Sequence, residues 1–116
     1  MRDLVEVTGV KIGVVVNTND PETAWNALRF GTTALQSNHQ VKIFLLGKGV
    51  EVQTLRDEKL DVKGQIDAFW KKGGVVMACG TCLRLRGMGE SEICPISTMN
   101  DLLKMVGESD KVVTFG

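Results

Sequence analysis

The sequence predicts an α/β fold, with a mainly parallel sheet of about five strands between helices on both of its faces. Two observations predict this class. Short, nearly continuous apolar runs, typical of strands covered on both faces, alternate with segments whose apolar residues recur at helical spacing. The chain of 116 residues, 43% of them hydrophobic, also suffices for one core. Because we find no linker, repeat or low-complexity segment, we expect residues 1–116 to form a single three-layer domain.

The first half of the chain predicts two strands and one long helix. Lys11 to Asn17 is the first apolar run. Asp20 suits a helix N-cap and Pro21 the first helical position, so a helix is expected from about Pro21 to Ser37. Val41 to Leu46 is the second buried strand, closed by a turn at Gly47-Lys48-Gly49. We expect a short helix and a surface loop from Val50 to Val62.

The second half predicts two more helices and three more strands. A helix is expected from Val62 to Lys72, before Gly73-Gly74, and a third strand from Val75 to Ala78. Ile93 to Ile96 is a short fourth strand interrupted by Pro95, and Lys111 to Phe115 is the last strand. Between them, Ser97 or Thr98 caps a helix that ends at Gly107, with an inner face formed by Met99, Leu102, Leu103 and Val106.

The formal net charge is zero, which argues against nucleic-acid binding through bulk charge and leaves little self-repulsion to oppose association. No apolar stretch is long enough to span a membrane, and the first residues lack the apolar core of a signal peptide. We therefore expect a cytoplasmic protein. Thiols are kept reduced there, so three cysteines favour reactive or inert thiols over structural disulfides.

The most informative motif is the Cys-x-x-Cys formed by Cys79 and Cys82 directly after the third strand. Open α/β sheets bind and react at the carboxyl ends of their strands. If a helix begins at Gly80 or Thr81, Cys82 lies one turn beyond Cys79, and the two side chains lie close together. A helix N-terminus favours the thiolate, which is the nucleophilic form of cysteine. The motif therefore indicates sulfur chemistry, redox chemistry or metal binding.

Other residues are candidates for the same site. Arg84 and Arg86 can stabilise an anionic sulfur, and Gly87 with Gly89 brackets a loop able to move over it. The candidates for lining the site are Asn17, Gly80, Thr81, Gly87 and Cys94.

Simpler interpretations compete with these roles. Free cysteines are often small buried hydrophobes, and this interpretation is preferred for Cys94, with a resolving thiol second. A tetrahedral metal site needs four ligands, whereas this chain offers one cysteine pair, Cys94 and a distant His39, so we expect no metal. His39 is interpreted as a solvated turn residue, and the Asn17–Asp20 segment as a helix cap, since it lacks the glycine pattern of nucleotide sites.

Two segments carry a family resemblance: Ala78-Cys79-Gly80-Thr81-Cys82-Leu83-Arg84-Leu85-Arg86-Gly87-Met88 and the closing Ser109-Asp110-Lys111-Val112-Val113-Thr114-Phe115. With the order of elements, they resemble the DsrE/DsrF-like family, and its YchN-like branch most closely, from Lys11 onward. Residues 1–10 form an N-terminal extension outside the resemblance.

The resemblance implies a small α/β domain that assembles into trimers or hexamers. In the sulfur-relay members, a cysteine after this strand accepts a sulfane sulfur as a persulfide and passes it on. Cys79 matches that carrier, and Cys82 matches the second cysteine of the YchN-like branch.

We therefore expect intracellular sulfur transfer, in which Cys79 accepts sulfur, Arg84 or Arg86 stabilises the anion, and Cys82 resolves or tunes the intermediate. The expected partners are further copies of the chain and proteins that donate and accept sulfur, without cofactor, membrane or direct nucleic-acid contact. Two alternatives stay open: a non-catalytic assembly or regulatory module, and a thiol–disulfide reductase.

Overall fold

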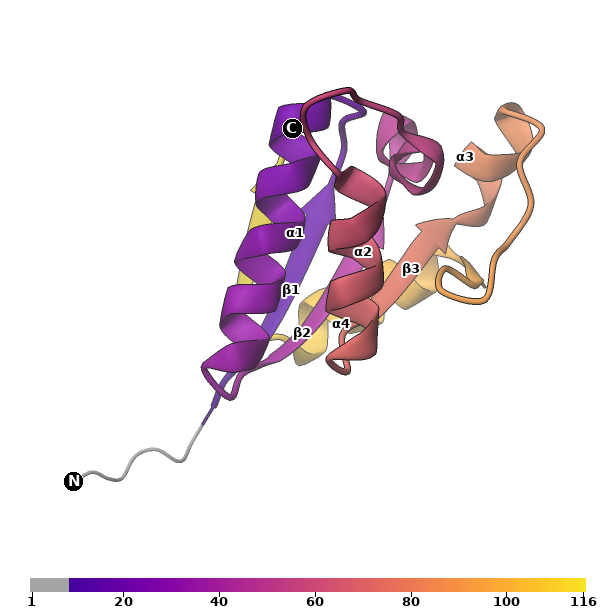
Figure 1. The fold of residues 1–116 in the computed structure, drawn as a ribbon. Helices are drawn as coiled ribbons and strands as arrows, with labels where there is room; N and C mark the ends of the chain where they lie inside the picture. The colour runs from indigo at the N-terminus through magenta and orange to yellow at the C-terminus, as the bar shows by residue number, and fades with distance from the viewer. Residues whose placement is uncertain (1–8) are drawn as a thin grey trace.

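Five parallel strands form one sheet in the computed structural model, which describes residues 9–116 (Figure 1). The strand order is β4-β3-β2-β1-β5. The strands are β1 (Lys11–Val16), β2 (Gln40–Leu45), β3 (Val75–Cys79), β4 (Ile96–Ser97) and β5 (Lys111–Phe115). The helices are α1 (Pro21–Gln36), the 3₁₀ helix η1 (Gly47–Thr54), α2 (Val62–Lys71), α3 (Gly80–Leu85) and α4 (Met99–Glu108). The predicted class, an α/β fold of three layers in a single domain, is confirmed.

The chain order explains why helices cover both faces of the sheet. From β1 the chain moves outward through β2 and β3 to β4, and α1 and α2 lie on one face of the sheet (Figure 1). From β4 it returns past β1 to β5, and α4, in this connection, lies on the other face (Figure 1). Connections between parallel strands are right-handed, so reversing the direction of travel places the connecting helix on the opposite face. The carboxyl ends of all five strands therefore meet at one edge, where α3 and η1 lie.

Local signals begin α1, α2 and α4 as predicted, whereas α4 continues to Glu108 and so passes Gly107, where its end was predicted. The side chain of Asp20 accepts a hydrogen bond from the Thr23 N–H at 2.9 Å, and Pro21 opens α1. Thr98 caps α4 in a reciprocal capping box with Asp101. α1 packs against α2 at Gly31, where an added Cβ would lie 2.8 Å from the Phe69 ring. The small residue thus lets the two helices approach closely.

Two other elements differ from their predicted bounds by more than one residue. Gly47-Lys48-Gly49 begins η1, whereas the sequence predicted only a turn there and a helix from Val50 onward. The fourth strand is Ile96–Ser97 and not Ile93–Ile96, because it begins after Pro95, which has no N–H to donate to a neighbouring strand.

The predicted inner face of α4 was wrong. Met105 is the buried residue of this helix and Leu102 is partly buried against the core, whereas Met99, Leu103 and Val106 are 59%, 69% and 42% exposed. α4 lies over β1 at Gly13, where an added Cβ would meet Met105. Its apolar residues thus form two stripes, and only the one containing Leu102 and Met105 faces the sheet.

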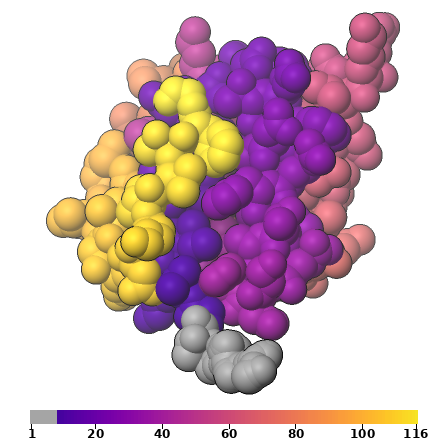
Figure 2. All heavy atoms as spheres, turned by 90° about the vertical axis from the view of Figure 1, so that its left-hand side faces the viewer, coloured from indigo at the N-terminus to yellow at the C-terminus, as the bar shows by residue number. Residues whose placement is uncertain are grey.

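β5 is an edge strand. Figure 2 shows the C-terminal residues in yellow, open to the surface beside the purple residues of α1. On the α1 side, the rings of Phe115 and Phe30 lie 6.0 Å apart, which ties β5 to that helix.

His39 lies just before β2, at the amino ends of the strands, and is partly buried. Its Nδ1 accepts a hydrogen bond from the Val10 N–H at 3.0 Å. This corrects its interpretation as a solvated turn residue, because the imidazole satisfies a backbone donor beside the start of β1.

Within residues 9–116, no helix is both long and apolar enough to cross a membrane. The expected N-terminal extension lies, in its first eight residues, outside the described part of the chain.

Candidate functional site

Cys79 is both the last residue of β3 and the N-cap of α3. Its backbone stays extended, with φ −62° and ψ 117°, and the helix begins at Gly80 as predicted. The residue is only 3% exposed. The strand end thus places this thiol at the carboxyl edge of the sheet with little contact with bulk water.

Cys82 lies one helical turn further on and is partly buried. Its Sγ accepts a hydrogen bond from the backbone N–H of Gly47, the first residue of η1, at 3.3 Å. Burial raises the pKa of the Cys82 thiol, and a hydrogen bond with the Cys79 side chain raises it further, while the Gly47 N–H opposes the shift. Both cysteines are free thiols. The two side chains therefore lie close together, as predicted, without being joined.

The surroundings of Cys79 include an open pocket of about 350 Å³. Its walls come from the start of α3, from β4 and from the start of α4, and include Gly80, Thr81, Arg84, Ser97 and Asn100. A Cβ added at Gly80 would lie 2.8 Å from Ile96 Cγ2 and 3.4 Å from Arg84 Nη1. Gly80 therefore leaves room between the arginine and β4 that any larger residue would fill.

The two predicted arginines occupy different positions. Arg84 is exposed, lines the Cys79 pocket and donates a 3.3 Å hydrogen bond to Thr81 Oγ1. Arg86 is partly buried, with its Nε 2.6 Å from Glu51 Oε2 and its Nη1 3.1 Å from the Cys82 carbonyl oxygen. Its guanidinium thus ties α3 to η1.

Glu51 belongs to the site, and sequence reasoning missed it. Its carboxylate accepts from Arg86 and, at 3.1 Å, from Asn19 Nδ2. These hydrogen bonds, with that of Arg86 the stronger cause, hold the pKa of Glu51 below its usual value. No local motif marks the residue, because its partners lie 32 and 35 positions away along the chain.

Of the remaining candidates, Asn17 follows β1 and lies on the η1 side of the site. Its Oδ1 would be 2.5 Å from a Cβ added at Gly47, which has a positive φ of 58°. Gly87 also has a positive φ and follows the end of α3. The Gly87 N–H donates to the Arg84 carbonyl, and the Met88 N–H donates to the Leu83 carbonyl, which is a common way for a helix to end.

Cys94 does not line the Cys79 pocket. It is fully buried and contributes to a separate pocket of about 280 Å³ with Gln53, Lys63 and Ser91. Burial raises the pKa of the Cys94 thiol to about 12. Near neutral pH this thiol is protonated and shielded, which is the state of a packing residue.

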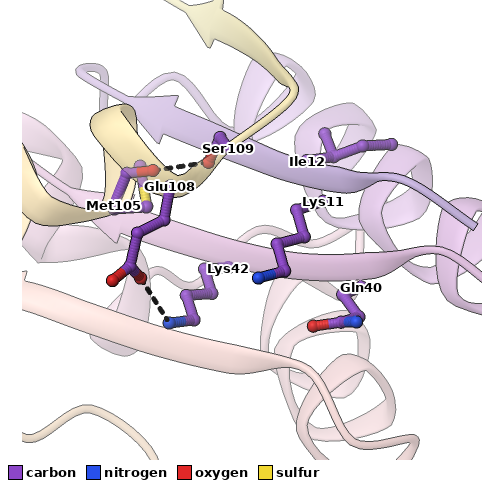
Figure 3. A pocket seen from close by; sticks show the side chains of 7 residues that line it. All are labelled: Lys11, Ile12, Gln40, Lys42, Met105, Glu108 and Ser109. Carbon is purple, nitrogen blue, oxygen red and sulfur yellow. Dashed lines mark hydrogen bonds and ion pairs between the residues drawn. The ribbon is translucent and has the colours of Figure 1, made fainter.

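Neither a metal cluster nor a second reactive cysteine pocket accompanies the site in the part of the chain that the structure describes. Within residues 9–116, no cluster of three or more histidine, cysteine, aspartate or glutamate residues is placed to bind a metal ion. A small cavity of about 50 Å³ lies at the amino ends of β1 and β2, where Lys42 lies 4.0 Å from Glu108. Figure 3 shows the side chains that line it. This cavity has no cysteine and lies at the edge of the sheet opposite Cys79 and Cys82.

The comparisons with known proteins identify the family and agree with the fold. The sequence profile of the DsrE/DsrF-like family matches residues 10–115. The chain is 39% identical over 100 residues to the uncharacterized protein MJ0989 of Methanocaldococcus jannaschii, covering 81% of this chain and 88% of that one. It is 34% identical over 116 residues to the uncharacterized protein MK0008 of Methanopyrus kandleri, covering 92% and 96%.

Among solved structures, the crystal structure of the ychN protein from E. coli superposes with a TM-score of 0.80 at 22% identity, covering 93% of this chain and all (100%) of that one. This likeness concerns the fold, and it agrees with the resemblance to the YchN-like branch. The chain belongs to the DsrE/DsrF-like family, whose function at the level of the family is sulfur relay.

Proposed function

We propose that this protein carries sulfane sulfur on Cys79. The observation that supports this role most directly is the placing of Cys79 at the carboxyl end of β3, beside an open pocket and with a second thiol behind it. The Cys79 thiolate attacks the outer sulfur of a donor persulfide. A bond forms between Cys79 Sγ and that sulfur, the donor's S–S bond breaks, and the donor thiolate leaves and takes up a proton.

Cys82 is proposed to resolve the intermediate. Its thiolate attacks Cys79 Sγ, the bond to the outer sulfur breaks, and hydrosulfide leaves with both electrons of that bond. A Cys79–Cys82 disulfide remains, and an external dithiol reductant resets it. Because the pKa of Cys82 is raised, most of this thiol is protonated near neutral pH, which slows self-discharge and leaves time for an acceptor thiol to take the outer sulfur instead.

The two arginines have different roles in this proposal. Arg86 is neutralised by Glu51 and holds α3 against η1, so it acts as a positioning residue. Arg84 lines the Cys79 pocket, and within residues 9–116 no carboxylate pairs with it. Arg84 is therefore the cation on the Cys79 side of the site, while burial raises the pKa of the Cys82 thiol and the charge of Arg86 opposes that rise.

The test is intact-mass spectrometry after incubation with a persulfide donor, before and after mild reductant. We expect wild-type protein to gain one sulfur that reductant removes, and Cys79→Ser to gain none while keeping its far-ultraviolet circular dichroism spectrum. Cys82→Ser is expected to hold the sulfur longer than wild type. Cys94→Ser is the matched control, because its thiol is buried outside the pocket. Full loading of Cys79→Ser would refute the role of Cys79.

The close approach of the two thiols also favours a second candidate, a thiol–disulfide reductase that cycles between the dithiol and a Cys79–Cys82 disulfide. In the same experiment this activity gives a loss of two hydrogens without a gain of sulfur. Discharge of the carrier by Cys82 leaves the same disulfide, so the two functions are distinguished in Cys82→Ser, in which a carrier still gains one sulfur on Cys79 and a reductase gains none.

We also propose that copies of this chain associate through α4. Met99, Leu103 and Val106 recur at i, i+4 and i+7, which places them along one side of the helix, and all three are exposed. A continuous apolar stripe of this kind is typical of a protein contact, and the net charge of zero does not oppose self-association.

Light scattering coupled to gel filtration tests the association. Leu103→Glu is expected to reduce the molar mass of the wild-type species towards that of one chain. Thr33→Glu, which adds the same charge at an exposed position of α1, is expected to leave it unchanged. A monomeric wild-type protein would refute the proposal. The remaining expectations are proteins that donate and accept sulfur, a cytoplasmic location, and the absence of direct nucleic-acid binding.

A further inference from the structure

The pocket beside Cys79 contains a cation that no lining carboxylate neutralises. Arg84 is the one charged side chain among the described residues that line it, and no carboxylate joins it there. Two acidic residues accept hydrogen bonds from the backbone of lining residues: Asp101 from the Thr98 N–H at 2.8 Å, and Glu90 from the Ile96 N–H at 3.2 Å. Both keep their negative charge, but neither forms an ion pair with Arg84. The guanidinium is held over Gly80, immediately after Cys79 in the chain, by its hydrogen bond to Thr81.

The pocket has room for a small molecule in front of Cys79. The thiol is 3% exposed, and the space in front of it is about 350 Å³. Two apolar side chains, Ile96 and Met99, line the same pocket as the polar Ser97 and Asn100. A short carbon chain that ends in a carboxylate suits this combination, because the chain contacts the apolar groups while the carboxylate faces the guanidinium.

We propose that Cys79 also accepts sulfur directly from a small persulfide that carries a carboxylate, besides any protein donor, and that Arg84 recognises this carboxylate. The inference rests on the proposed function and adds the chemical class of the donor. The carboxylate pairs with Arg84, and the persulfide lies towards Cys79. The Cys79 thiolate then attacks the outer sulfur, the donor's S–S bond breaks, and the carboxylate-bearing thiolate leaves and takes up a proton.

The experiment uses three donors of similar size that differ in charge: the persulfides of 3-mercaptopropionate, 2-mercaptoethanol and cysteamine. Loading rates of Cys79 are measured by intact mass for wild type and for Arg84→Gln. Leaving thiols differ in their own reactivity, so each donor is compared only with itself between the two proteins. We expect Arg84→Gln to slow the anionic donor about threefold to tenfold and the neutral donor little, and to leave the cationic donor unchanged or faster.

Two variants complete the design. Arg84→Lys keeps the charge and is expected to restore part of the preference for the anionic donor. Arg56→Gln removes the same charge from an exposed residue outside this pocket and is expected to change no rate.

An equal slowing of all three donors in Arg84→Gln would overturn donor recognition and show that Arg84 acts on the Cys79 sulfur, while the proposed function would stand. Unchanged rates for all three would overturn it as well. If wild-type Cys79 takes up sulfur from none of the three donors, the inference fails, and the proposed function stands only if a protein donor loads Cys79.

Discussion

Gly47 connects the backbone of η1 to the chemistry of Cys82, so Gly47→Ala probes both. Gly47 has a φ of 58°, in the left-handed region that disfavours residues with a Cβ. An added Cβ would lie 2.5 Å from Asn17 Oδ1, and the N–H of Gly47 donates to Cys82 Sγ. The substitution therefore strains the backbone, displaces the Asn17 side chain and disturbs the hydrogen bond to sulfur.

The two causes of lost stability can be separated. Holding alanine in the left-handed region costs about 1 to 2 kcal/mol. Moving the Asn17 side chain adds to this cost, and Asn17→Ala removes that second part. We expect Gly47→Ala to lower the free energy of unfolding by at least about 1 kcal/mol in urea denaturation, and by less in the Asn17→Ala background. Equal costs in both backgrounds would show that Asn17 does not oppose the added methyl group.

The same variant changes the reactivity of Cys82. The Gly47 N–H lowers the pKa of this thiol, so weakening that hydrogen bond lets the pKa rise further. A higher pKa leaves less thiolate near neutral pH, and alkylation of Cys82 by iodoacetamide, followed by peptide mass spectrometry, is expected to become slower. A variant that is destabilised as expected but alkylates Cys82 at the wild-type rate would refute the link between η1 and the thiol.

Two further predictions concern pH. Because burial raises the pKa of Cys94 to about 12, the folded protein keeps this thiol protonated where the unfolded chain ionises it, above its ordinary value of 9.0. Its contribution to stability is therefore complete below pH 9.0 and falls by about 1.4 kcal/mol per pH unit above that value. The difference in the free energy of unfolding between wild type and Cys94→Ala should accordingly shrink as the pH rises above 9.0. A constant difference would contradict a buried thiol. Glu51→Gln removes the partner of Arg86 and is expected to lower the urea midpoint at neutral pH, whereas Glu58→Gln, at an exposed position, should not. Since the pKa of Glu51 is lowered from 4.5, the carboxylate stabilises the fold above that value. The difference in urea midpoint between wild type and Glu51→Gln should therefore vanish as the pH falls through the lowered pKa. Equal midpoints at neutral pH would contradict the role of the ion pair.

The architecture was predictable because its signals are local. Asp20 and Pro21 begin α1, Gly73 and Gly74 follow α2, and the apolar runs of β1 and β2 indicate strands covered on both faces. The covered face of α4 was not predictable. Apolar residues occupy two sides of that helix, and periodicity alone does not say which side meets the sheet.

For the site, the sequence predicted that Cys79 ends a strand and that Cys82 follows one helical turn later. It did not predict that Glu51 neutralises Arg86 while Arg84 faces the pocket. The two arginines are two positions apart, which turns them towards different sides of α3, and only the folded chain shows which side meets η1.

Locating the transferred sulfur in wild-type protein tests the central claim most directly. After loading with a persulfide donor, all thiols are alkylated rapidly in denaturant, which exposes the buried Cys94. Tryptic cleavage then places both cysteines of the motif in one peptide, Gly73 to Arg84, so fragment ions must separate them. We predict that the added sulfur lies on Cys79, with Cys82 and Cys94 alkylated as ordinary thiols. An added sulfur found on Cys82 or Cys94, or on none of the three, would contradict the account.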